Sequence, residues 1–114
     1  MSIQYSDDGD HFRRISIAGR LDIAGTDAIA TQFAALAASA PRRVIVDLTA
    51  VSFLASIGIR ALISNAKALQ QRGGKMVLLV GSNESVAKTL ETTGIDTLIP
   101  MFADAGEATQ AALG

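Results

Sequence analysis

The chain has 114 residues, of which 49% are hydrophobic and 18% charged, and its formal net charge is −1. This length and composition favour one folded domain with its own hydrophobic core over a disordered chain. The near-neutral charge argues against nucleic acid as a partner, because a phosphate backbone is bound by a concentrated basic surface. The absence of cysteine excludes disulfides and thiolate chemistry, and the single His11 is too little for a histidine-rich metal site.

Membrane association is not expected either. No apolar run approaches the roughly 20 residues that a helix needs to span a bilayer. The sequence begins MSIQYSDDGDHF, which is polar and acidic and unlike a secretory signal. We therefore expect a cytoplasmic protein with no membrane partner.

The first predicted elements are two strands that form an antiparallel hairpin. Ile3 and Tyr5 alternate with polar residues, the acidic segment 7–10 marks a turn, and a second strand spans His11–Ala18. The sequence GRLD at 19–22 breaks the strand pattern and ends this second strand.

A helix is predicted next. Thr26 or Asp27 is suited to cap its first turn, because short polar side chains accept hydrogen bonds from free N–H groups there. The residues of its apolar stripe recur at helical spacing: Ile29, Phe33 and Leu36. Pro41 is expected to stop the helix.

Strands and helices alternate along the rest of the chain. The predicted elements are a buried strand at Val44–Leu48, a loop with Phe53 and Leu54, a helix from Ser56 to Gly73-Gly74, a strand at Met76–Val80, a short helix capped by Ser82-Asn83 and closed by Gly94, a strand at Leu98-Ile99 and a helix over Ala103–Leu113. This order predicts one α/β domain over residues 1–114, with a mixed, mostly parallel sheet of about five strands and about four helices. Sites in such sheets lie beyond the carboxyl ends of strands.

Ser56 lies at one of these ends, in the segment Ala55-Ser56-Ile57-Gly58. Unpaired N–H groups at a helix start favour an anion. Three roles therefore fit Ser56: helix N-cap, catalytic nucleophile or phosphorylation site. The nucleophile is disfavoured, because the only histidine lies in the hairpin and the segment lacks the first glycine of a G-x-S-x-G elbow. A glycine-rich phosphate loop is absent as well, so we expect neither enzymatic activity nor a cofactor.

Three charged residues near strand or helix ends are further candidates. Asp22 suits a turn or a helix cap, and Asp47 can bind loop N–H groups and shape the turn after its strand. Arg60 follows Ser56 by one helical turn. It can pair with a phosphate on Ser56 or with an acidic group of a partner, or it can be a solvated arginine on the outer helix face.

The segment VIVDLTAVSFLASIGIRALI resembles the signature of STAS domains, specifically of bacterial anti-sigma factor antagonists. That signature is an apolar strand ending in Asp-Leu, an apolar pair, Asp-Ser-Ser/Thr-Gly and an apolar helix. The GRLD segment at 19–22 resembles the family's Gly-x-Leu-Asp turn, and the strand Lys75–Val80 and the Gly94-Ile95 pair also fit. The resemblance extends from Ile3 to Ala112.

This resemblance implies a partner-switching mechanism. In the family, the unphosphorylated antagonist binds a serine-kinase anti-sigma factor and frees the sigma factor. The kinase then phosphorylates a hydroxyl in the signature loop, and a PP2C-like phosphatase resets the switch. Carried over to this sequence, the phosphoacceptor is Ser56. The implied partner-binding residues are Asp22, Ala55, Ser56, Ile57, Gly58 and Arg60.

Two residues depart from the family signature. Ala55 replaces the aspartate, and Ile57 replaces the second hydroxyl, which is the modified one in some members. Ser56 is favoured as phosphoacceptor because it is the only hydroxyl in the motif. The loss of the aspartate supports an alternative: a STAS scaffold that needs no phosphorylation, such as a subunit of a transporter or of a stress-signalling complex.

Overall fold

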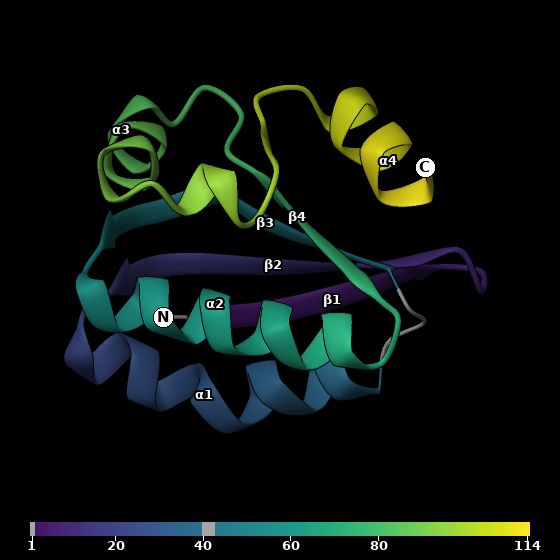
Figure 1. Ribbon diagram of the computed structural model, residues 1–114. Coiled ribbons are helices and arrows are strands. Elements are labelled where there is room, and N and C mark those ends of the chain that lie inside the picture. Colours follow the sequence, from purple (N-terminus) through teal and green to yellow (C-terminus); the bar gives the residue numbers. More distant parts are fainter. Residues whose placement is uncertain (1, 40–42) are drawn as a thin grey trace.

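The computed structural model describes residues 2–39 and 43–114, which form a mixed five-stranded sheet with four α-helices (Figure 1). The strands are β1 (Ser2–Asp8), β2 (Phe12–Leu21), β3 (Arg43–Leu54), β4 (Lys75–Leu79) and β5 (Met101–Phe102). The helices are α1 (Ile23–Ala38), α2 (Ser56–Gln71), α3 (Glu84–Thr93) and α4 (Ala105–Leu113), with a 3-10 turn η1 (Ile95–Thr97) after α3.

The sheet has the strand order β1-β2-β3-β4-β5. Strands β1 and β2 pair antiparallel, and the other neighbours pair in parallel. Helices α1 and α2 lie side by side against one face of the sheet, whereas α4 lies against the other (Figure 1). The predicted α/β fold with a largely parallel sheet is confirmed.

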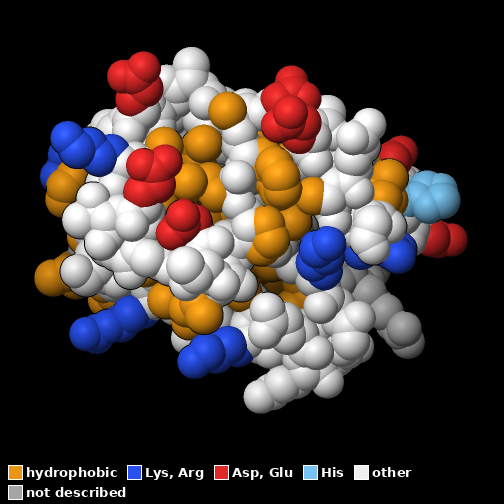
Figure 2. Space-filling view, turned by 45° about the horizontal axis from the view of Figure 1, so that its top comes forward, with side chains coloured by type: hydrophobic (Ala, Val, Ile, Leu, Met, Phe, Trp, Pro, Cys, Tyr) orange, Lys and Arg blue, Asp and Glu red, His pale blue; other side chains and the backbone are white. Residues whose placement is uncertain are grey.

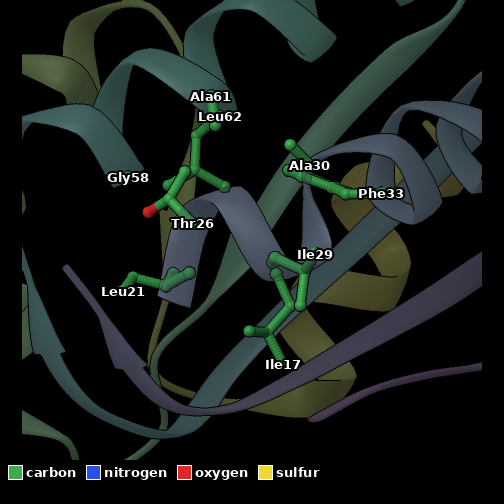
Figure 3. A pocket seen from close by; sticks show the side chains of 9 residues that line it. All are labelled: Ile17, Leu21, Thr26, Ile29, Ala30, Phe33, Gly58, Ala61 and Leu62. Atoms are coloured by element: carbon green, nitrogen blue, oxygen red, sulfur yellow. The ribbon is translucent and has the colours of Figure 1, made fainter. Parts of the chain in front are cut away.

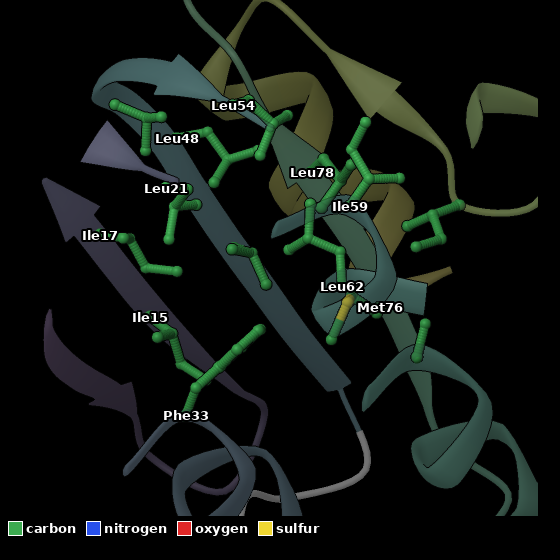
Figure 4. Packing of buried hydrophobic residues seen from close by; sticks show 14 of the residues in the cluster. Ile15, Ile17, Leu21, Phe33, Leu48, Leu54, Ile59, Leu62, Met76 and Leu78 are labelled. Atoms are coloured by element: carbon green, nitrogen blue, oxygen red, sulfur yellow. The ribbon is translucent and has the colours of Figure 1, made fainter. Parts of the chain in front are cut away.

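The hydrophobic core follows from the alternation of side chains along the central strands. On β3, Val44 and Val46 face α1 and α2, whereas Ile45 faces α4. Because successive side chains point to opposite faces, covering both faces requires the continuous apolar run seen in the sequence. Figure 4 shows the larger cluster, in which Phe33 of α1 and Leu62 of α2 meet side chains of the sheet.

Strands β2 and β3 are longer than predicted. β2 continues through the GRLD segment to Leu21, and β3 continues past Leu48 to Leu54, so Phe53 and Leu54 lie in a strand instead of a loop. The two extensions pair with each other, with irregularities in register after Ser16 and after Gly19. Gly19 has a φ of +102°, a backbone conformation that residues with a Cβ avoid.

The bounds of two other elements also differ from the prediction. Helix α1 starts at Ile23, because its N-cap is Asp22 and not Thr26 or Asp27; a cap at Thr26 would have started the helix four residues later. Leu98-Ile99 is not a strand: the Ile99 N–H donates to Ile95 O at 2.9 Å, which continues the turn of η1, and the last strand is β5. Pro41 lies outside the described residues, and α1 ends at Ala38.

Three predicted helix ends are confirmed. The Gly74 N–H donates to Leu69 O at 2.8 Å, which closes α2 at the glycine pair. Asn83 caps α3, accepting a hydrogen bond from the Val86 N–H. Gly94 takes the left-handed conformation after α3, with a φ of +74°, as expected for a glycine C-cap.

Candidate functional site

The candidate site lies where β2 and β3 end side by side and α1 and α2 begin. Leu21 and Leu54 are register partners at the ends of these strands. The Ala55 N–H donates to Leu21 O at 3.0 Å, which joins the start of α2 to the end of β2. The N-cap residues of the two helices, Asp22 and Ala55, are therefore neighbours. The structure thus brings together the two motifs that the sequence singled out.

Ser56 is the first residue of α2 and is exposed to solvent. Its predicted role as N-cap is wrong, because Ala55 holds the cap position with extended backbone dihedrals, φ −88° and ψ 169°. Alanine has no side-chain acceptor, so this helix start has no side-chain cap. Within residues 2–39 and 43–114, the Ser56 hydroxyl makes no hydrogen bond. The hydroxyl is therefore accessible and has no structural bond to lose when it is modified.

Asp22 caps α1, which confirms the expectation of a turn or cap residue. Its Oδ1 accepts a hydrogen bond from the Gly25 N–H at 2.8 Å, and its Oδ2 lies 3.4 Å from Arg20 Nε. The Gly25 N–H lowers the pKa of the Asp22 carboxyl, an effect that burial opposes and Arg20 reinforces. Asp22 is therefore an ionised cap beside the start of α2.

Two glycines let the helix starts approach the ends of the strands. A Cβ on Gly25 would lie 1.9 Å from Arg20 O, and a Cβ on Gly58 would lie 3.0 Å from Leu21 Cβ. The first distance is shorter than any that real Cβ atoms show, and the second is tighter than nine in ten real Cβ contacts. Gly58 therefore allows α2 to pack closely against the end of β2, which explains in physical terms why the motif has glycine there.

A small cavity lies between α1 and α2 below this junction (Figure 3). Its volume is about 10 Å³, and its walls are almost entirely apolar. The hydroxyl of Thr26 is buried beside it and has no hydrogen-bond partner among residues 2–39 and 43–114. The volume suffices for one water at most, so the cavity is not a binding site for a metabolite.

Exposed hydrophobic side chains occur at the start of α1 and near the end of β3, the two segments that meet at this junction. Ile23, the first residue of α1, is 69% exposed, and Phe53, near the end of β3, is 41% exposed. Arg20 stacks over the Phe53 ring at 4.5 Å. Exposed apolar residues that gather in one place mark surfaces for other proteins. The sequence analysis missed Ile23, Phe53 and Arg20, since the stack of Arg20 on Phe53 depends on the β2–β3 register.

Comparisons with known proteins identify the family. A family model for the STAS domain matches residues 7–108. The chain belongs to the STAS domain family. This confirms the resemblance found in the signature segment, and the match extends over most of the domain. No curated protein sequence matches the chain.

Solved structures show the same STAS fold. An anti-sigma factor antagonist from Mycobacterium paratuberculosis is 24% identical, with a TM-score of 0.84 over 99% of this chain and 96% of that one. An anti-sigma-factor antagonist (STAS) domain protein from Planctomyces limnophilus is 28% identical, with a TM-score of 0.80 over 96% of each chain. The phosphorylated form of the Bacillus cell fate determinant SpoIIAA is 19% identical, with a TM-score of 0.68 over 96% of this chain and 98% of SpoIIAA.

The remaining candidate residues occupy different places in this STAS domain. Arg60 is exposed on α2 and makes no hydrogen bond in the described part of the chain, as a solvated arginine would. Asp47 lies within β3 and is buried. It accepts a hydrogen bond from the Thr49 N–H at 2.9 Å, but Thr49 also lies in β3, so the prediction that Asp47 shapes a turn after its strand is wrong. Asp47 also pairs with Arg14 at 2.6 Å, which sequence reasoning missed. Burial alone would raise the pKa of Asp47, but hydrogen bonds from Thr49 and Arg14 outweigh it and lower the pKa.

Charged groups are dispersed over this STAS domain. Across residues 2–39 and 43–114, no cluster of three or more histidine and acidic side chains is arranged to hold a metal ion. On the face seen in Figure 2, acidic and basic side chains are interspersed around hydrophobic ones, without a broad basic surface. None of the helices described is long and apolar enough to cross a membrane. His11 is exposed at the turn between β1 and β2.

Proposed function

We propose that this STAS domain is an anti-sigma factor antagonist that binds a serine-kinase regulator and is switched by phosphorylation of Ser56. The observation that carries the proposal is the state of Ser56, an exposed residue at the first position of α2 whose hydroxyl makes no hydrogen bond to the described part of the chain. It is also the only hydroxyl in the signature Ala55–Gly58. The likeness to SpoIIAA, whose phosphorylated form has the same fold, supports a modifiable hydroxyl here.

The helix start makes phosphorylation compatible with the fold. A phosphoserine adds a charge of about −1.5 to −2, and the free N–H groups of a helix N-terminus stabilise such an anion. The neighbouring cap of α2 is Ala55, so a phosphate on Ser56 does not face the carboxylate that the family signature has there. The modification changes the charge of the surface while leaving the core intact.

The partner surface consists of the helix starts and the exposed side chains around them. Ile23 and Phe53 supply apolar contact area, and Arg60 supplies positive charge, whereas the charge of Arg20 is paired with Asp22. These groups favour a partner surface with apolar and acidic side chains. A phosphate on Ser56 would offset the positive charge and would be desolvated in the complex, so the phosphorylated form should dissociate.

The domain acts in this proposal as the substrate of the kinase, and it has no catalytic role itself. Activating Ser56 as a nucleophile would require a nearby base. The single histidine, His11, lies at the opposite end of β2, a ten-residue strand, about 30 Å long at the usual rise per residue. A PP2C-like phosphatase would remove the phosphate and restore the binding form.

The proposal is tested with a serine-kinase anti-sigma factor from the same cell and ATP, with the modified residue located by mass spectrometry. We expect phosphate on Ser56 and none on the Ser56→Ala variant, which should still bind the kinase. Ser56→Asp should weaken binding about a hundredfold, as a coupling of a few kcal/mol would. Tight binding with an unmodified Ser56 would exclude the switch and leave a constitutive binder.

Ala55 favours a second candidate function, a STAS scaffold within a larger complex that needs no phosphorylation. The family signature has an aspartate at this position, and its loss removes a carboxylate from the switch surface. The scaffold predicts equal binding of its partner by wild type, Ser56→Ala and Ser56→Asp. The same binding series therefore separates the two functions.

A further inference from the structure

The second half of β3 extends beyond its neighbour β4. The last residue pair between the two strands is Asp47 with Leu79, whereas β3 continues to Leu54. On its other side, this extension pairs with β2 through two irregularities, and at each of them β3 has one residue more than β2. Such bulges bend a strand and interrupt its ladder. The second half of β3 therefore extends past β4 on one side and pairs with β2 through two irregularities on the other.

Beyond the last β3–β4 residue pair, the side chain of Asn83 binds the backbone of β3. Its Nδ2 donates to Val51 O at 2.7 Å and to Leu48 O at 3.2 Å. Its Oδ1 accepts a hydrogen bond from the Val86 N–H at 3.3 Å and caps α3. The side-chain amide of Asn83 thus donates two hydrogen bonds to β3 and accepts one from α3. These three are most of the hydrogen bonds that an asparagine side chain can make.

The loop that carries Asn83 is itself fixed against β3. The Asn83 N–H donates to Val80 O at 3.0 Å, which closes a tight turn directly after β4. Gly81 in this turn has a φ of +58°, and a Cβ there would lie 2.8 Å from Thr49 Cγ2. The backbone around Asn83 is therefore held by a turn and by close packing, so its amide meets β3 in one defined orientation.

We propose that Asn83 is a positioning residue for the switch segment. It fixes Leu48 and Val51 on β3, and β3 leads within four residues from Val51 to Ala55, the cap of α2. Ala55 is joined in turn to Leu21 O at the end of β2. Holding the β3 extension between β2 and Asn83 sets the place of Ser56. The use of this arrangement in signalling rests on the function proposed above, whereas the arrangement itself is testable alone.

Amide hydrogen exchange of the full chain, resolved by residue with NMR, tests the inference. The variants are Asn83→Asp and Asn83→Ser, since both keep an acceptor to cap α3 but lack the amide NH2 group that donates to Leu48 O and Val51 O. We expect exchange at the Ala55 and Ile59 amides to accelerate about tenfold, because local opening then breaks fewer hydrogen bonds. Exchange in β4 and α4 should stay unchanged. Asn65→Asp, which removes an amide donor to Ala61 O within α2, is the matched control.

Two results would overturn the inference. Unchanged exchange at Ala55 in both Asn83 variants would show that β2 alone holds the segment. An equal acceleration in β4, α4 and the switch segment would show that Asn83 only supports the fold as a whole. The exchange experiment needs no kinase, so its result is independent of whether Ser56 is phosphorylated. Failure of the proposed function would appear in the phosphorylation assay alone.

Discussion

Gly25→Ala is expected to destabilise the domain strongly, although alanine is the better helix former. Gly25 lies in the first turn of α1, and its N–H donates to the Asp22 carboxylate at 2.8 Å. An added Cβ would lie 1.9 Å from Arg20 O. This carbonyl belongs to β2 and cannot rotate away as a side chain could, so either α1 or the end of β2 must move by more than an ångström.

The size of the effect follows from three terms. Alanine gains about 1 kcal/mol over glycine in a helix. Overpacking against backbone costs about 3 kcal/mol, the upper part of its usual range. Displacing the helix start weakens the Asp22 cap by about 1 kcal/mol. We therefore expect a net loss of about 3 kcal/mol, which corresponds to a fall in Tm of about 10 °C for a domain of this length.

Thermal and urea unfolding followed by circular dichroism measure this loss. Gly106→Ala is the matched control, because Gly106 is an exposed helical glycine of α4 whose Cβ would meet only the end of the Asp104 side chain, at 3.0 Å. The control should unfold within about 1 kcal/mol of wild type. A Gly25→Ala variant as stable as the control would refute the close approach of α1 to β2 at this site.

Three further substitutions test the core and the site. Thr26→Val should raise the free energy of unfolding by up to about 1 kcal/mol in urea titrations, because it removes a buried hydroxyl that has no partner among the described residues. A fall in the free energy of unfolding by more than about 1 kcal/mol would show that the hydroxyl is bonded. Asp47→Asn should cost about 1–3 kcal/mol at pH 7, since Arg14 and Thr49 lose a charged partner. The pKa of Asp47 is lowered in the folded state, so its contribution to the free energy of unfolding is present above the unfolded pKa of about 4 and is lost as the pH falls through the folded pKa. A difference in unfolding free energy between wild type and Asp47→Asn that does not shrink at acid pH would contradict this. Ser56→Ala should change the unfolding free energy by less than about 0.5 kcal/mol, because its hydroxyl makes no bond in the described residues; a larger loss would reveal a structural role.

Local sequence signals predicted most of the fold. Asn83 and Gly94 mark the ends of α3, because a short amide caps a helix start and glycine alone takes the left-handed conformation without strain. The apolar run of β3 predicted a strand covered on both faces, and the apolar run of β4 predicted another strand. These signals are contained in a few adjacent residues, so they can be recognised without knowledge of the tertiary contacts.

The misplaced bounds depend on contacts between distant segments. The extensions of β2 and β3 are stabilised by pairing with each other around two irregularities, and neither segment alternates clearly by itself. β5 has only two residues and is defined by its pairing with Leu78 and Leu79 of β4. Ser56 was assigned one position too early in its helix, since alanine at the cap gives no side-chain signal.

The sequence predicted the motif residues of the candidate site but not the exposed residues around them. Asp22 and Ser56 were both identified from the sequence, and the structure brings their two segments together. The stack of Arg20 on Phe53 and the exposure of Ile23 depend on strand register and on where α1 starts. The contribution of Asn83 could not be foreseen, because its partners lie more than 30 residues earlier in the chain.

The proposed switch requires that the exposed Ser56 hydroxyl is a phosphoacceptor. The most direct measurement is tandem mass spectrometry of the protein isolated with phosphatase inhibitors from the cells that produce it. We expect a fraction of the protein to carry a single phosphate on Ser56, and this species to be lost in cells that carry Ser56→Ala. Phosphate confined to another hydroxyl, or a chain without phosphate when its kinase partner is present and active, would show that Ser56 is not the phosphoacceptor.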